Sequence, residues 1–111
     1  MAFPDFYDMD GNPISADEFA TAWSTEDRFL KRDTIYVGGR KVLISTIWLG
    51  IDHDFSLSGP PQIFETLIDS SDISDEYIWR YATKFAALEG HKRAVNMFRD
   101  PTGAPKWPDG L

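Results

Sequence analysis

The strongest constraint on the fold is a long apolar run, Val42–Ile51, which follows two adjacent glycines, Gly38 and Gly39. Its side chains are apolar at odd and at even positions, so an extended strand here would be apolar on both faces. Such a strand is typical of the centre of a sheet, or of a strand covered on each side. Two glycines between β-forming residues indicate a tight hairpin, which pairs this run with the preceding strand, Arg28–Val37.

The same reading predicts two further strands and two helices. The strands are expected at Gln62–Asp69 and Tyr77–Thr83, where side chains alternate between turn-forming segments. Short connections between neighbouring strands favour an antiparallel meander. A short helix should begin after Ser15, because Glu18 stands three residues later and completes a capping box. A second helix is expected from Lys84 to about Phe98, with Thr83 as its N-cap.

The predicted fold class is therefore α+β, with a four-stranded antiparallel sheet (meander) and an N-terminal short helix and a C-terminal helix packed on it. Helices placed before and after the strands suggest that both pack on one sheet face. By length, residues 1–100 should form a single α+β domain. Residues 101–111 contain three Pro and two Gly, so we expect an extended tail. The apolar stripe of the second helix is predicted at Phe85, Leu88, Val95 and Phe98.

Composition limits the setting in which this chain works. It has no cysteine, so it has no disulfide framework and no thiolate for catalysis or metal binding, which favours a reducing cytoplasm. No apolar run approaches the ~18 residues of a membrane span. The N-terminus has no basic residue before its apolar positions, so it is not predicted to be a signal peptide. We expect a cytoplasmic protein that does not contact a membrane.

Charge is the next limit on function. The formal net charge is -7, which disfavours direct binding to nucleic acid phosphates. Acidic residues are also segregated: residues 1–27 contain seven acids, and neither residues 1–27 nor 42–79 contain Lys or Arg. If these segments meet in space, they form a negative surface that can attract a basic partner, although such a surface can also serve solubility alone. The expected contact residues are Asp52, His53, Asp54, Asp69, Asp72, Asp75 and Glu76.

A polar cluster directly after the apolar run suggests an alternative, a metal site. Histidine and carboxylate side chains are suitable ligands for a divalent cation. Neighbouring strand residues point to opposite faces, so within the cluster only Asp52 and Asp54 converge naturally. The competing interpretation is that His53 anchors a loop and His91 packs half-buried on the second helix. The metal-ligand candidates are Asp52, His53, Asp54, Glu65 and His91.

The segment Asp8-Met9-Asp10-Gly11-Asn12 has two weak motif matches. A calcium loop would need a bidentate Glu where Phe19 stands, and its glycine is misplaced. The nucleophile loop of haloacid-dehalogenase-type phosphatases would need a buried parallel strand before it and βα units after it. A turn is the favoured interpretation, because Gly and Asn tolerate positive φ.

The joint pattern of STIWLGIDHDF, PPQIFET, Trp79-Arg80-Tyr81-Ala82-Thr83 and Gly90-His91 resembles a group of small proteins from tailed bacteriophages. The likeness covers roughly residues 6 to 95. That group has no assigned biochemical role, so the resemblance implies no catalytic residue. It implies an intracellular protein made during infection of a bacterial host and dispensable for virion assembly.

Two hypotheses about function follow. The first is a non-enzymatic interaction protein, without a cofactor, that binds a host protein of a defence system or another host-takeover target. The second is a metal-dependent hydrolase or small-ligand-binding protein that uses the Asp52-His53-Asp54 cluster. A homodimer also stays open, because an edge strand such as Tyr77–Thr83 can pair across a two-fold axis.

Overall fold

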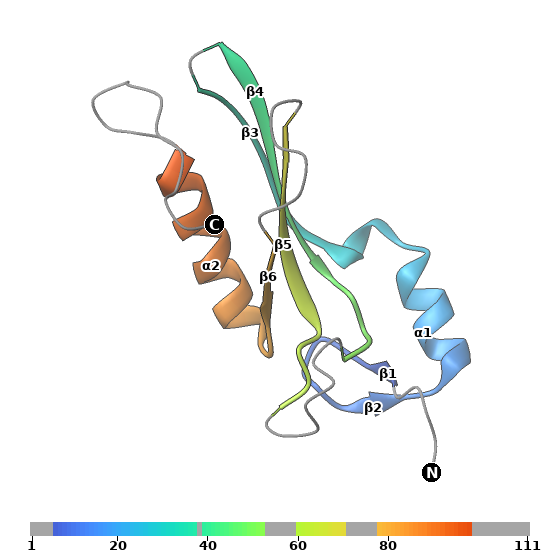
Figure 1. Cartoon of the computed structure of the whole chain (residues 1–111). Coiled ribbons are helices and arrows are strands. Elements are labelled where there is room, and N and C mark those ends of the chain that lie inside the picture. The colour runs from blue at the N-terminus through green and yellow to red at the C-terminus, as the bar shows by residue number, and fades with distance from the viewer. Residues whose placement is uncertain (1–5, 38, 53–59, 71–77, 99–111) are drawn as a thin grey trace.

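The computed structural model describes residues 6–37, 39–52, 60–70 and 78–98 (Figure 1). The predicted tail, residues 101–111, and with it the domain boundary, lie outside this range. The described elements, in chain order, are β1 (Phe6–Tyr7), β2 (Pro13–Ile14), α1 (Ala16–Trp23), the 3-10 helix η1 (Glu26–Arg28), β3 (Phe29–Val37), β4 (Arg40–Trp48), β5 (Phe64–Ser70), β6 (Ile78–Tyr81) and α2 (Lys84–Phe98).

The main sheet is the predicted four-stranded antiparallel meander, in the order β3-β4-β5-β6. Gly39 has a φ of 83°, which suits the tight turn between β3 and β4. The apolar run as far as Trp48 lies in β4, which is inside the sheet between two partners, as its pattern predicted. The predicted strand was three residues too long, since Ile51 lies beyond the end of β4. The α+β fold class is therefore confirmed.

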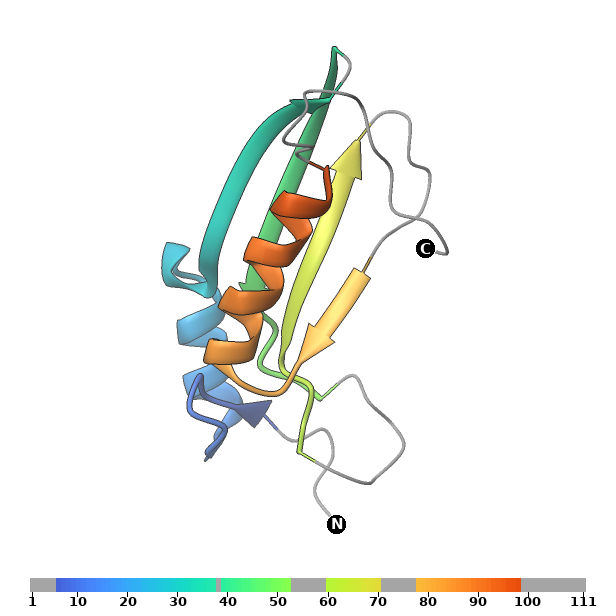
Figure 2. The same cartoon turned by 90° about the vertical axis from the view of Figure 1, so that its left-hand side faces the viewer.

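One face of the sheet packs against α2, which lies along it in both views (Figure 1, Figure 2). Alternation along β4 turns Val42, Ile44 and Thr46 toward this face, and all three are fully buried. In register with them, β5 contributes Ile68 opposite Ile44. Ala94, Val95 and Phe98 of α2 close the core from the other side.

The buried side of α2 differs from the predicted apolar stripe. Phe85 is 76% exposed and Leu88 is 39% exposed, so these two residues were wrongly placed in the core. Small residues occupy the contact instead, namely Ala87 and Gly90, both buried. A Cβ atom on Gly90 would overlap the Tyr81 ring. The close approach of α2 to β6 at this glycine therefore determines which side of the helix is buried. Packing distance has overridden hydrophobic periodicity here.

The N-terminal part packs elsewhere, which corrects the expectation that both helices share one sheet face. Figure 1 shows α1 and α2 on opposite sides of the sheet, with α1 beside one end of it. Phe19 and Trp23 of α1 contact Trp48 at the end of β4, with ring centroids 5.7 and 6.3 Å apart. The β1–β2 hairpin joins the same end, since the Tyr7 N–H donates to the Gly50 carbonyl at 2.9 Å.

Both helix starts follow their sequence signals. The Glu18 N–H donates to Ser15 Oγ at 3.1 Å, and the Ser15 N–H donates to Glu18 Oε1 at 2.9 Å, so the capping box is complete. At the start of α2, the Ala86 N–H donates to Thr83 Oγ1 at 3.0 Å. In the described part of the chain, no helix has the length and apolarity needed to cross a bilayer.

Candidate functional site: an acidic groove and a buried histidine network

A cavity of about 570 Å³ opens between the β1–β2 turn, α1 and η1. Its apolar lining is half-buried or buried, whereas most of its carboxylates are exposed, so it has an apolar floor and an acidic rim. We call it the acidic groove. Its apolar residues are Met9, Ile14, Ala22 and Trp48, and its acidic residues are Asp8, Asp17, Glu18 and Asp27.

The segregation of acids in residues 1–27 thus becomes a spatial feature. The first turn of α1 brings Asp17 and Glu18 to the rim. Their negative charges also interact favourably with the positive N-terminal end of the helix dipole. The backbone N–H of Ser15, and then its side chain, hold the pKa of Glu18 below its ordinary value. The Glu18 carboxylate is therefore ionised at neutral pH.

Asp8 reaches the groove from the turn between β1 and β2. Its Oδ1 accepts hydrogen bonds from the N–H groups of Asp10 and Asn12, both at 2.9 Å. Gly11 in the same turn has a φ of 86°. The turn interpretation of this segment is therefore confirmed. The Asp8 carboxylate stabilises the turn, whereas the two motif matches would assign it to a cation or a phosphoryl group.

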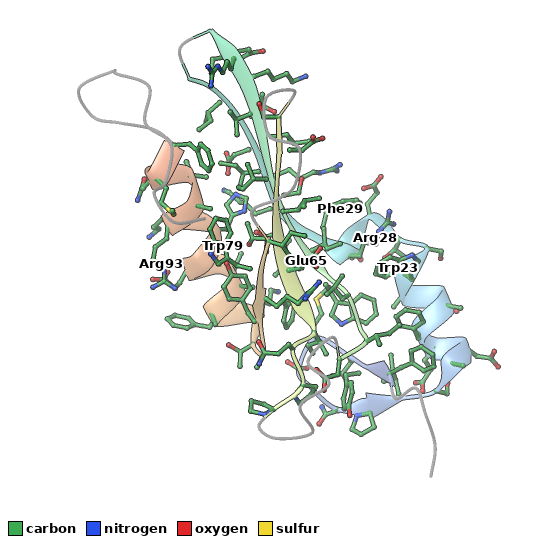
Figure 3. The ribbon with its side chains drawn as sticks, viewed as in Figure 1. Trp23, Arg28, Phe29, Glu65, Trp79 and Arg93 are labelled. Carbon is green, nitrogen blue, oxygen red and sulfur yellow. The ribbon has the colours of Figure 1, made fainter. Side chains whose placement is uncertain are left out.

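One base, Arg28, lines the groove, and its charge is already engaged. Its guanidinium donates to the carbonyls of Trp23 at 2.9 Å and of Thr25 at 3.3 Å, at the C-terminal end of α1. It also lies 4.5 Å from the ring centroid of Phe29 and 5.2 Å from that of Trp23. Figure 3 shows the side chains of Trp23, Arg28 and Phe29 gathered beside η1. Four carboxylates against one engaged guanidinium leave the groove negative.

The predicted contact residues fall largely outside the described part of the chain, which includes neither residues 53–54 nor 71–77. Of the two that are described, Asp52 is half-buried, and its Oδ1 accepts the Gln62 N–H at 2.8 Å. It thereby ties together the two described ends of the connection between β4 and β5. Asp69 is exposed on β5. The residues not described are His53, Asp54, Asp72, Asp75 and Glu76.

The candidate metal ligands are not brought together where they are described. Glu65 follows the strand alternation away from α2, and its Oε2 accepts a hydrogen bond from Arg80 Nε at 3.2 Å. His91 of α2 lies on the other sheet face, hydrogen-bonded to Thr46. Among the described residues, no group of three potential ligands lies close enough to hold a metal ion.

His91 instead belongs to a buried network that links α2 to three strands. Its Nδ1 lies 2.7 Å from Thr46 Oγ1, which lies 2.6 Å from Thr66 Oγ1, and its Nε2 lies 2.7 Å from Asp33 Oδ2. His91 is 3% exposed, and both threonines are fully buried. Sequence reasoning recognised a packing role for His91 but missed these partners. The signal that could have found them was a threonine at a core-facing position of both β4 and β5.

The order Asp33, His91, Thr46 has the connectivity of a catalytic triad, but its surroundings differ. A nucleophile must reach the substrate, whereas Thr46 Oγ1 lies beneath α2 with no exposed surface. Each hydrogen bond of the imidazole can be given a donor and an acceptor: His91 Nε2–H donates to Asp33, and the Thr46 hydroxyl donates to His91 Nδ1. The network therefore acts as a structural link between the helix and the sheet.

Comparison with known proteins found no matching family model, curated protein or solved structure. Among the described residues, we take the acidic groove as the candidate site because it combines an apolar floor with a charged rim.

Proposed function

We propose that this protein is a non-enzymatic interaction protein whose acidic groove binds a basic, amphipathic segment of another protein. The observation that carries the proposal is the combination, in one concave site, of an apolar floor that includes Trp48 with a rim of four carboxylates. Apolar floors supply binding energy through desolvation, and charged rims select the partner.

The chemistry of the groove defines the segment that fits it. A lysine or arginine can lay its aliphatic stem on Met9 and Ile14 while its charged end reaches the rim. Asp17 and Asp27 suit this role, because neither has an ion-pair partner among the described residues. The cavity volume of about 570 Å³ is of the size that accommodates a few side chains.

The remaining acids attract a basic partner before it makes contact. A net charge of -7 attracts a basic surface over distances longer than the contact itself. We assign this steering role to the predicted contact residues outside the groove, Asp52 and Asp69 among them. The resemblance to phage proteins makes a bacterial host protein the proposed partner, in the cytoplasm of the infected cell, with a defence or host-takeover component as the target.

A titration with a defined peptide tests the groove directly. The probe is a short synthetic peptide that alternates Lys with Leu, and its control alternates Glu with Leu. We expect the basic peptide alone to shift the amide signals of Thr21 and Ala22 and the indole signal of Trp48 in two-dimensional NMR spectra. The shifts should shrink as salt is added. Shifts spread evenly over the surface, or equal shifts with both peptides, would contradict the proposal.

A charge-matched pair of variants separates the groove from overall charge. Asp17→Asn combined with Asp27→Asn should weaken peptide binding by about tenfold, since two rim contacts with a cation are lost. Glu89→Lys on α2 changes the net charge equally but lies outside the groove, so binding should stay within about twofold. Capture from a bacterial lysate with the same variants extends the test: a host protein bound through the groove should be lost only with the first variant.

A further inference from the structure

The sheet face opposite α2 is a second surface, distinct from the acidic groove. Figure 1 shows α2 covering one face, while α1 lies beside one end of the other. Large apolar side chains remain exposed on this open face: Tyr36 is 71%, Ile78 44% and Leu67 39% exposed. Leu43 and Ile47 beside them are half-buried. A folded chain that leaves aliphatic and aromatic side chains together on a sheet face offers an interaction surface.

The charges on the open face are nearly balanced. Strand alternation and register place three bases and two acids here, and Glu26 pairs with Arg32 at 3.4 Å, so the face is close to neutral on a chain of net charge -7. Two copies of this chain that approach through this face therefore avoid the repulsion between their strongly acidic regions. The charged residues are Arg32, Lys41, Arg80, Glu65 and Asp69.

Lys41 and Asp69 make the face self-complementary. Asp69 pairs in register with Leu43, and Lys41 lies two residues before Leu43 on the same strand, so the two charges are diagonal neighbours. Both are exposed, and neither has an ion-pair partner among the described residues. A two-fold axis that runs between them would bring Lys41 of each copy opposite Asp69 of the other, close to Leu43 on both copies. An isologous interface repeats such a pair twice.

We propose that the open face of the sheet binds a second copy of this chain, with reciprocal Lys41–Asp69 pairs across a two-fold axis. The face is small: four strands, the longest of nine residues, measure roughly 15 by 27 Å. Stable dimers bury about 800 Å² per subunit. We therefore expect a weak dimer, with a dissociation constant on the order of 100 µM. The fraction of dimer then depends on the protein concentration.

Analytical ultracentrifugation from about 10 µM to about 1 mM tests the proposal, since this range brackets the dissociation constant expected for so small an interface. The wild-type protein should shift from monomer to dimer. Lys41→Glu and Asp69→Lys each replace two attractions by two repulsions, so each variant should dissociate about tenfold more readily. An equimolar mixture of the two variants should dimerise again, because both reciprocal contacts of the heterodimer join side chains of opposite charge.

Three outcomes would overturn the proposal. The wild-type protein could stay monomeric over the whole range. The single variants could dimerise as well as the wild type, which would point to another surface such as pairing of the β6 edge. The mixture could remain as dissociated as its components. Circular dichroism melts of both variants check that they fold, and recovery of the dimer in the mixture itself excludes unfolding as the cause of the loss. The groove is not involved, so these outcomes leave the peptide titration unaffected.

Discussion

Replacing Gly90 by Ala tests how closely α2 must approach the sheet. In a helix interior, Ala is favoured over Gly by about 1 kcal/mol. In this protein the added methyl group would overlap the hydroxyl end of the Tyr81 ring, and overpacking of this kind costs about 1–3 kcal/mol. Moving α2 away would also stretch the 2.7 Å contact between His91 and Thr46, which costs about 1 kcal/mol. We expect the free energy of unfolding to fall by about 2 kcal/mol.

Urea unfolding of Gly90→Ala, Tyr81→Ala and the double variant decides whether this reasoning holds. The loss of about 2 kcal/mol corresponds to a melting temperature lower by about 10 °C for a domain of this size. In the Tyr81→Ala background the methyl group has room, so Gly90→Ala should instead stabilise by about 1 kcal/mol. A Gly90→Ala variant that is more stable than the wild type, or that has the same effect in both backgrounds, would refute the claim that Tyr81 sets the spacing of helix and sheet.

Three further predictions concern single positions. Thr46→Val keeps the side-chain shape but removes the hydroxyl bonded to His91, so urea unfolding should show a loss of about 2 kcal/mol; an unchanged midpoint would mean that the network adds no stability. Gly50 has a φ of 75°, and a Cβ there would meet Phe19, so Gly50→Ala should cost about 2–3 kcal/mol and alter the near-UV circular dichroism; a wild-type spectrum and melting temperature would argue against it. The pKa of Glu18 is lowered in the folded state, so the ionised carboxylate stabilises the fold above its ordinary pKa of 4.5, and this stability is lost as the pH falls through the folded pKa. Glu18→Gln should remove this part of the acid dependence of the melting temperature. An identical pH slope in the variant and the wild type would contradict the assignment.

Most of the fold could be predicted because its signals are local. The glycine pair before β4 indicated the hairpin, and the capping box at Ser15 located the start of α1. α2 spans Lys84–Phe98, the predicted bounds, since Thr83 caps it in the sequence as in the structure. Each signal acts within a few residues, so no tertiary information was needed. Short connections between strands then left the meander as the simplest topology.

The side chains that meet could not be predicted in the same way. His91 and Asp33 are 58 positions apart, and only the crossing of α2 over β3 brings them to 2.7 Å. Periodicity favoured Phe85 as a core residue, yet the close contact at Gly90 rotates that face into solvent. Such outcomes depend on the distance and rotation between packed elements, which no short window of sequence contains.

By itself the sequence determined the elements, their order and the excess of acids near the N-terminus, because propensity, capping and charge are properties of neighbouring residues. Tertiary packing alone decided that four of those acids surround an apolar floor with Trp48, and that the two described helices leave one face of the sheet uncovered. The physical reason is that burial is shared between distant segments: α1 covers the aromatic end of β4, α2 covers one face of the sheet, and the strand residues that neither helix reaches stay exposed.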